Sequence, residues 1–290
     1  MATTYNNLYL DIRRQLKAAD IPAAQLEARE IVCVAAEKTL EEFYRDMSLY
    51  MSDQVEEKAR ELAARRLAGE PVAYIVGEWE FYGLTLDVTP DVLIPRIDTE
   101  VLAEQAILRA RAAGEGCRVL DLCTGSGCVG LAIAANAPES KVVLADISEA
   151  ALKVCKGNIR RTGLVAQTAA VQADARMSPL PAFCHYFDVI ACNPPYIRRD
   201  EMPRLDPSVR DYEPHLALEG GEDGLDFYRA VVTRWKEALK MGGTLLFEVG
   251  AGQAPAVEKL LMENGYQIID SYQDTQGIWR VVSGTLQETM

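Results

Sequence analysis

One stretch of four residues has backbone and side-chain groups suited to holding an amide or an amine: Asn193-Pro194-Pro195-Tyr196. The two prolines have no N–H group, so the backbone there offers carbonyl acceptors without competing donors. Asn193 adds a side-chain carbonyl and Tyr196 adds a flat ring. Two acceptors can hold the two hydrogens of a planar –NH2 group while the ring packs on its plane. The nitrogen is then placed to attack an electrophilic methyl group, a displacement that depends mainly on positioning.

A glycine-rich turn follows the strand predicted over 118–122, and it reads Asp121-Leu-Cys-Thr-Gly125-Ser-Gly127-Cys-Val-Gly130. Glycines let the backbone approach a ligand closely, and the helix that begins there offers unpaired N–H groups. Asp146 ends the next predicted strand, where a carboxylate can accept hydrogen bonds from both hydroxyls of a ribose. The same residues match the dinucleotide fingerprint, so they indicate a nucleoside-containing cofactor without specifying which one.

Together the two motifs favour methyl transfer, because hydride transfer does not require a motif that binds an –NH2 group. Three alternatives stay open. An NAD-dependent oxidoreductase fits the glycine pattern taken alone, and a non-catalytic binding protein could use the same scaffold. An adenine-N6 methyltransferase would use the same acceptor chemistry on DNA or RNA, provided the base is flipped out or single-stranded.

The overall charge argues against a nucleic-acid substrate. The chain has 290 residues, with 30 Lys and Arg against 43 Asp and Glu and a formal net charge of −13. Proteins that hold a phosphate backbone normally present a basic surface. The composition therefore fits an enzyme that acts on a small molecule or on a basic protein.

Cysteine and histidine usage predicts no metal site. Seven cysteines include no C-x-x-C pair, and there are 2 histidines, His185 and His215. The first residues show no signal-peptide pattern, and no run of about 18 apolar residues is present. We therefore expect a cytoplasmic protein that does not enter the membrane.

The N-terminal residues 1–75 predict a small domain of about four helices. Apolar residues recur at helical spacing from Tyr5 to Leu16, Thr39 and Glu42 form a capping-box pattern, and Ser52 can cap a further helix. Residues 76–95 alternate apolar and polar around Tyr82-Gly83, which predicts a β-hairpin that links two domains.

From residue 96 to 290 the chain alternates strand and helix. Strands are predicted near 118–122, 141–145, 169–173, 187–191, 243–249, 266–272 and 277–283. Strands separated by helices indicate a mainly parallel sheet covered on both faces, and the two adjacent closing strands can form an antiparallel edge. Glu248 ends one of these strands, and either an ion pair with a neighbour or a place in the cofactor pocket would explain a carboxyl there.

The glycine turn with Asp146 and the Asn193–Tyr196 motif resemble those of class I S-adenosylmethionine-dependent methyltransferases. Three further motifs resemble the release-factor glutamine N5-methyltransferases, the PrmC/HemK family: Gly77-x-x-x-Phe81-Tyr-Gly, Val88-x-Pro90-x-Val-Leu-Ile-Pro95-Arg96-x-x-Thr99-Glu100 and Tyr212-Glu-Pro214-x-x-Ala217-Leu218. That family methylates the glutamine of the Gly-Gly-Gln motif of peptide-chain release factors. Its fold is a helical domain, a hairpin linker and a seven-stranded Rossmann-like domain, which agrees with the α/β pattern above. A ribosomal-protein glutamine methyltransferase remains the nearest alternative.

The resemblance implies a role for each matching residue. Cofactor-binding residues would be Cys123, Thr124, Gly125, Ser126, Gly127, Asp146, Asp174, Ala175 and Asn193. The substrate glutamine would be held by Asn193, Pro194, Pro195 and Tyr196, with Asn193, Pro194 and Tyr196 as the catalytic residues. The chain has Cys123 where the family often has glycine and Ile97 where it often has proline, and Ala175 offers adenine no aromatic face.

The resemblance also implies partners. We expect S-adenosylmethionine as cofactor, a release factor as protein substrate docked by the helical domain, no direct contact with nucleic acid, and a monomeric enzyme. Residues 200–226 carry nine acidic residues against two arginines. Because this stretch follows Tyr196, we expect it to border the substrate entrance and attract a basic loop of the release factor.

Overall fold

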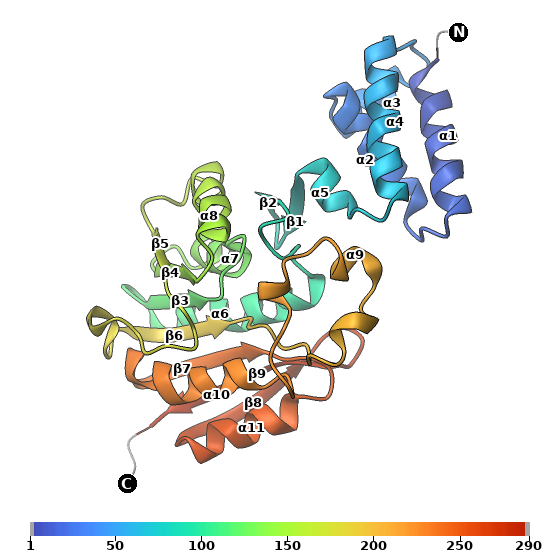
Figure 1. The fold of residues 1–290 in the computed structure, drawn as a ribbon. Coiled ribbons are helices and arrows are strands. Elements are labelled where there is room, and N and C mark those ends of the chain that lie inside the picture. The colour runs from blue at the N-terminus through green and yellow to red at the C-terminus, as the bar shows by residue number, and fades with distance from the viewer. Residues whose placement is uncertain (1–2, 288–290) are drawn as a thin grey trace. The chain divides into compact units, whose positions relative to one another are not determined.

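The computed structural model describes residues 3–287, which divide into two compact units (Figure 1). The helical unit falls within Met1–Glu78 and also includes Asp206–Tyr212. The sheet unit falls within Trp79–Leu205 and Glu213–Met290. Each unit is therefore assembled from two separate stretches of chain.

The helical unit has one apolar core, around which five helices pack: α1 (Tyr5–Ala18), α2 (Ala24–Ala36), α3 (Leu40–Asp46), α4 (Asp53–Leu67) and α5 (Val72–Val76). The short helix α9 (Pro207–Arg210) also belongs to this unit, but none of its residues is buried. The apolar face of α1 predicted from its spacing is buried in the core. The capping box of Thr39 and Glu42 and the Ser52 cap of α4 are both present, so these predictions are confirmed. No helix of residues 3–287 is long and apolar enough to cross a bilayer.

The segment Asp206–Tyr212 comes from far along the chain yet belongs to this unit. The Tyr212 hydroxyl donates a hydrogen bond to the Ala68 carbonyl (3.0 Å), just past the end of α4. Gly69 lies beside the same ring, and a Cβ there would meet Tyr212 Cε2 at 3.6 Å. Sequence patterns predicted the first four helices of this unit, but they predicted neither α5 nor the return of residues 206–212.

The predicted hairpin is formed by β1 (Glu78–Phe81) and β2 (Leu84–Asp87). Its two turn residues, Tyr82 and Gly83, have φ values of 48° and 77°. Positive φ at both central residues is the geometry of a type I′ turn, whose twist matches that of the flanking strands. Phe81 and Leu86 are buried in a core of the sheet unit.

The sheet unit contains a seven-stranded sheet, as predicted. Its strands are β3 (Arg118–Leu122), β4 (Lys141–Asp146), β5 (Thr168–Gln172), β6 (Phe187–Cys192), β7 (Leu239–Glu248), β8 (Tyr266–Gln273) and β9 (Trp279–Leu286). The spatial order is β5-β4-β3-β6-β7-β9-β8, and the first five strands run parallel. β9 is antiparallel to both β7 and β8, which confirms the predicted antiparallel C-terminal edge.

Helices cover both faces of this sheet (Figure 1). One face packs against α6 (Glu100–Ala113), α7 (Cys128–Asn136) and α8 (Glu149–Arg161). The other face packs against α10 (Asp226–Arg234) and α11 (Ala254–Glu263). Helix α10 was not predicted from the sequence, although Tyr228, Val231 and Val232 recur at helical spacing and are fully buried in the core.

The sheet topology explains why the candidate site residues gather. β3, β4 and β6 are parallel neighbours, so their carboxyl ends lie at the same edge of the sheet. Leu122 on β3 pairs with Ala145 on β4 and with Cys192 on β6. The glycine turn, Asp146 and Asn193 each follow directly from these paired residues. Ligands of open parallel sheets bind at this edge.

Candidate active site

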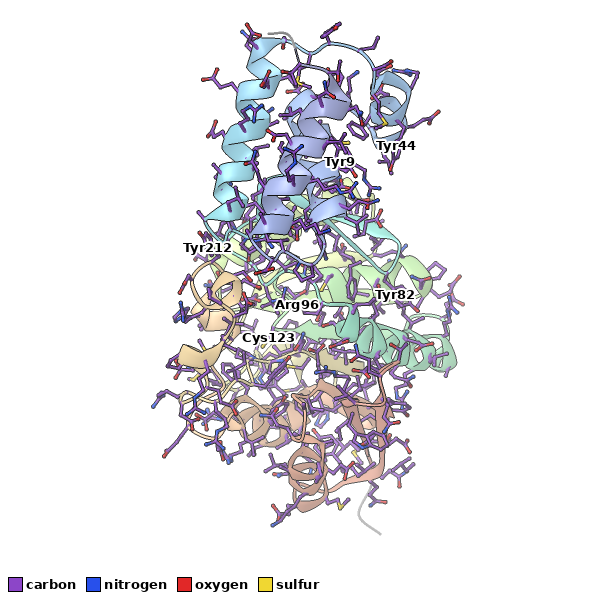
Figure 2. The ribbon with its side chains drawn as sticks, turned by 90° about the vertical axis from the view of Figure 1, so that its right-hand side faces the viewer. Tyr9, Tyr44, Tyr82, Arg96, Cys123 and Tyr212 are labelled. Carbon is purple, nitrogen blue, oxygen red and sulfur yellow. The ribbon has the colours of Figure 1, made fainter. Side chains whose placement is uncertain are left out.

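A cavity lies at this edge of the sheet, within the sheet unit. Most of the predicted cofactor residues line it: Cys123, Thr124, Gly125, Ser126, Asp146, Asp174, Ala175 and Asn193, together with Pro195 of the acceptor motif. Arg96 and Cys123, labelled in Figure 2, are both lining residues and come from segments on opposite sides of α6 in the sequence. Three predicted site residues, Gly127, Pro194 and Tyr196, do not line the cavity.

The glycine turn is held by the buried carboxyl of Asp121. Its Oδ2 accepts hydrogen bonds from the Gly130 N–H (2.8 Å) and from the Thr124 hydroxyl. Burial raises the pKa of Asp121 to about 7, although these hydrogen bonds oppose the rise. Asp121 therefore ties the end of β3 to both the turn and the first residues of α7.

Two glycines of the turn have different tasks. Gly127 adopts φ +89° as the N-cap of α7, and a Cβ there would crowd Cys155, Leu131 and Leu144 at 3.1 to 3.2 Å. The absence of a side chain at Gly127 therefore lets the helix pack closely on the strand. Gly125 adopts φ +54° and has nothing within 4 Å of the place a Cβ would take, so its backbone faces the cavity. Cys123 also has a positive φ of 64°, a conformation that costs a non-glycine residue roughly 1 kcal/mol or more.

Asp146 is positioned by backbone donors on either side. Its Oδ2 accepts from Gly125 N (2.8 Å) and its Oδ1 accepts from Ser148 N (2.9 Å). Desolvation raises the pKa of the carboxyl, and these backbone hydrogen bonds oppose that rise. Each carboxylate oxygen has a second lone pair, so both can still accept hydrogen bonds from a diol placed in the cavity.

The acceptor motif presents Asn193 and Pro195 to the cavity. The Asn193 Nδ2 donates to the Thr99 hydroxyl (3.4 Å), which leaves Oδ1 as the side-chain atom able to accept a hydrogen bond from a substrate. Pro194 is buried. Tyr196 packs against the core on the α10 face of the sheet, and burial raises the pKa of its hydroxyl.

An ion pair between the buried Glu213 and the partly exposed Arg96 lies at the cavity. The Glu213 side chain is almost fully buried, and its Oε2 accepts from the Ile94 N–H (3.2 Å). Its Oε1 accepts from the Arg96 guanidinium. Because Pro95, Arg96 and Pro214 all line the cavity, this pair joins two lining segments that are far apart in the sequence.

Phe227 is a lining residue that sequence reasoning missed. It belongs to α10, and the Arg176 guanidinium lies 5.5 Å from its ring centroid. Arg176 in turn pairs with Asp174. The segment that follows β5 is therefore connected to α10 at the cavity. The aromatic face that Ala175 does not offer is available here from Phe227.

The acidic stretch 200–226 is less negative than its own composition predicts. Arginines just outside it pair with its carboxylates: Arg198 with Asp200, Arg199 with Glu219, and Arg229 with Asp223 and Asp226. Glu213 is paired with Arg96. The excess charge predicted for steering a basic loop is therefore largely neutralised, and the count of nine acids against two arginines overstates it.

Glu248 lies at the end of β7 in a buried polar cluster. It faces the Thr99 and Tyr196 side chains, Arg280 of β9, and Asp98. Its Oε2 has no hydrogen-bond partner within residues 3–287, and Glu248 does not belong to the residues that line the cavity. Burial raises the pKa of this carboxyl from 4.5 to about 7, with Thr99 and Arg280 opposing the rise.

We expect Glu248→Gln to change how stability depends on pH. Between pH 4.5 and about 7, the folded wild type binds more protons at this carboxyl than the unfolded chain does. The free energy of unfolding therefore falls as pH rises through this window, by at most about 1.4 kcal/mol per pH unit. Glutamine removes that fall, so the variant gains stability relative to wild type on going from about pH 5 to about pH 8.

Urea unfolding at several pH values measures this difference. Glu104→Gln, an exposed site on α6, is the matched control and is expected to follow the wild type. Asp121 is unchanged in all three proteins, so its own titration cancels. Parallel pH curves for wild type and Glu248→Gln would show that the carboxyl is not titrating in this range.

Among residues 3–287, no group of three or more His, Cys, Asp or Glu side chains is arranged to hold a metal ion. The cysteines described here are all free thiols. The lining residues of the cavity carry carboxylates, hydroxyls, thiols, an amide, two guanidinium groups and apolar side chains.

Comparison with known proteins identifies two regions. Residues 7–77 match the model of the PrmC N-terminal domain, and residues 95–205 match that of the methyltransferase small domain. A release factor glutamine methyltransferase from Thermodesulfovibrio yellowstonii is 38% identical over 257 residues, which cover 88% of this chain and 90% of the relative. One from Geobacter sulfurreducens is 43% identical over 227 residues, covering 78% and 77%.

Solved structures share the fold at low identity. A methyltransferase from Pyrococcus furiosus superposes with a TM-score of 0.53 and 18% identity, covering 78% of this chain and 98% of that one. This likeness supports the methyltransferase fold of the sheet unit.

Proposed function

Because the chain belongs to the release factor glutamine methyltransferase family, we propose that it methylates the side-chain amide nitrogen of a release-factor glutamine, with S-adenosylmethionine as methyl donor. The observation that carries this proposal is the placement of Asn193 and Asp146 on one cavity. Asn193 offers an acceptor for an amide, and Asp146 offers acceptors for a ribose. The two halves of the proposed reaction therefore meet in one place.

The residues of the cavity fit S-adenosylmethionine by their chemistry. Asp146 can accept from both ribose hydroxyls, and the backbone at Gly125 faces the cavity without a side chain in the way. Phe227 and Ile147 offer apolar surface for a purine, with Asp174 beside them as a polar group. When bound, the cofactor supplies an electrophilic methyl group on a sulfonium.

In this proposal the chain contributes positioning rather than acid–base chemistry. Asn193 Oδ1 and the Pro194 carbonyl accept the two amide hydrogens, and Tyr196 packs on the amide plane. Asp146 and the Gly125 backbone would hold the cofactor, which would supply the methyl group to the amide nitrogen and keep the sulfur, while a proton from that nitrogen would pass to water. Orientation of this kind can supply several kcal/mol of barrier lowering. The roles of Pro194 and Tyr196 stay predictions, since neither lines the cavity.

The division of labour is part of the proposal. Residues 1–75 would bind the release factor, residues 76–95 would link the two domains, and residues 96–290 would catalyse the methyl transfer. The enzyme would act in the cytoplasm as a monomer, on the glutamine of the Gly-Gly-Gln motif, without contacting nucleic acid directly.

Mass spectrometry of release-factor peptides tests the proposal. Incubation with the protein and S-adenosylmethionine is expected to add one methyl group to the Gly-Gly-Gln glutamine, and a release factor with alanine at that glutamine is expected to stay unmodified. Transfer to the alanine-substituted factor would refute the site assignment. Transfer to DNA or RNA, or to a ribosomal protein, with none to the release factor would favour the corresponding alternative.

A further inference from the structure

The side chain of Gln253 connects three segments behind the acceptor motif. It stands at the N-cap of α11, directly after the turn that leaves β7. Its Nε2 donates to the Tyr196 carbonyl (3.0 Å) and to the Gly224 carbonyl (3.4 Å). Its Oε1 accepts from the Gly250 N–H (2.9 Å) and from the Tyr228 hydroxyl (3.3 Å).

These contacts use both ends of the amide. Two carbonyls require a donor at Nε2, while an N–H and a hydroxyl require an acceptor at Oε1. The single hydroxyl hydrogen of Tyr228 is shared with the Glu248 carbonyl, which is the nearer acceptor (2.9 Å), so the acceptor end of Gln253 lies beside the end of β7. A carboxylate at this position would keep the acceptor contacts but would face two carbonyl oxygens without a hydrogen to donate.

Glycines let the backbone around Tyr196 be enclosed closely. A Cβ on Gly220 would lie 2.6 Å from Tyr196 Cα, and a Cβ on Gly224 would lie 2.4 Å from the Tyr196 carbonyl oxygen. Gly250 packs on the Tyr196 ring, where a Cβ would lie 3.1 Å from Cδ2. Because backbone atoms fill this space, Tyr196 has little room to shift while Gln253 holds it.

The motif lies between two fixed points. On one side β6 ends at Cys192, paired in the sheet with Phe247. On the other side Ile197 exchanges hydrogen bonds with the 218–220 segment, to the Leu218 carbonyl (2.9 Å) and from the Gly220 N–H (2.8 Å). The prolines between these points cannot donate backbone hydrogen bonds. This stretch therefore has few backbone N–H groups with which to anchor itself. The hydrogen bond that Gln253 donates to the Tyr196 carbonyl helps to hold it in place.

We infer that Gln253 is a positioning residue for methyl transfer: by holding the Tyr196 carbonyl, it sets where Asn193 and Pro195 face the cavity. This inference rests on the proposed function, because it assigns Gln253 to the reaction proposed above. Gln253 does not line the cavity, so it acts through the motif and not by touching the cofactor.

The decisive variant is Gln253→Glu, which keeps size and the acceptor atom and removes the donor. We expect kcat for release-factor methylation to fall by roughly 10- to 100-fold, the effect of a small misplacement of reacting groups. We expect the S-adenosylmethionine Kd from calorimetry to stay within about twofold of wild type. Lowering the pH is expected to restore part of kcat, since a protonated carboxyl again offers a hydrogen to the Tyr196 carbonyl.

Gln267→Glu is the matched control, because it makes the same change at an exposed site on β8. Its kcat and pH profile are expected to equal those of wild type. Gln253→Ala is the second variant, expected to lower kcat without recovery at low pH. Thermal melting of each variant identifies any fraction that fails to fold, and rates are compared per folded protein.

Two outcomes would overturn the inference while leaving the proposed function intact. One is an unchanged kcat in Gln253→Glu, and the other is a rise in the cofactor Kd that matches the loss of rate. An inactive wild type would instead refute the proposed function, so the two failures are distinguishable.

Discussion

Asn193→Ala is expected to lower kcat for release-factor methylation by on the order of 10²- to 10³-fold while leaving the cofactor Kd within a few-fold of wild type. The reason is geometric. With Nδ2 hydrogen-bonded to Thr99 at 3.4 Å, Asn193 Oδ1 is the side-chain acceptor that the motif presents to the cavity. Alanine removes this acceptor, so the amide nitrogen is no longer held for attack, whereas Asp146 and the glycine turn keep their own hydrogen bonds.

Steady-state kinetics with a purified release factor and calorimetry with S-adenosylmethionine measure the two quantities separately. Asn136→Ala is the control, because Asn136 is a half-buried asparagine whose Nδ2 donates to the Ala132 carbonyl at the end of α7. It is expected to retain the wild-type rate. Loss of both activity and cofactor binding in Asn193→Ala would mean that Asn193 is needed for the cavity itself rather than for the substrate.

Asp146→Ala is expected to have the second large effect, on cofactor affinity. A hydrogen bond to a charged group contributes roughly 1.5–3 kcal/mol, so losing two of them predicts a rise in Kd of about 100-fold or more. The substitution also leaves the Gly125 and Ser148 N–H groups without the carboxylate that orders them. We expect kcat at saturating cofactor to change much less than Kd.

Asp146→Asn separates the contributions of charge and of shape. It keeps one acceptor and the side-chain volume, so its Kd is expected to fall between those of wild type and Asp146→Ala. Calorimetry gives the affinities, and thermal melting without cofactor shows whether the turn is intact. Wild-type affinity in Asp146→Ala would contradict the assignment of the ribose to this carboxyl.

Local patterns predicted the elements well because their physics is local. The Thr39 capping box, the turn at Tyr82-Gly83 and the alternation of strands and helices after residue 96 all depend on neighbours within a few residues, and all are present. The observed sheet order explains why Asp146 and Asn193 lie at one cavity, because parallel neighbouring strands bring their carboxyl ends to one edge.

These local patterns could not predict contacts between segments that are far apart in the sequence. The sequence around Glu213 does not indicate that its carboxyl accepts a hydrogen bond from the Ile94 N–H. Likewise, the sequence around Gln253 does not indicate that its side chain donates to the Tyr196 carbonyl. The acidic stretch was misjudged for a simpler reason. Its charge was counted within fixed limits, and the arginines that neutralise it, Arg198, Arg199 and Arg229, stand just outside them.

Tertiary packing also decides what a single residue presents to its surroundings. The contact of the Tyr196 ring with the core beside Gly250 could not be read from the residue type, and its role toward the substrate stays a prediction. Phe227 was overlooked because α10 was not predicted, although the helical spacing of its apolar residues was there to find.

The discontinuous make-up of the helical unit has a consequence for how the protein is made. The ribosome delivers Asp206–Tyr212 only after β3, β4, β5 and β6 have been synthesised, so the N-terminal helices emerge long before the segment that completes their unit. The buried residues of the helical core all fall within 5–75, so these helices can pack together before Asp206–Tyr212 is added. A protease cut near residue 205 would therefore release one end of the late-added segment, which docks on Ala68 past the end of α4, without opening that core.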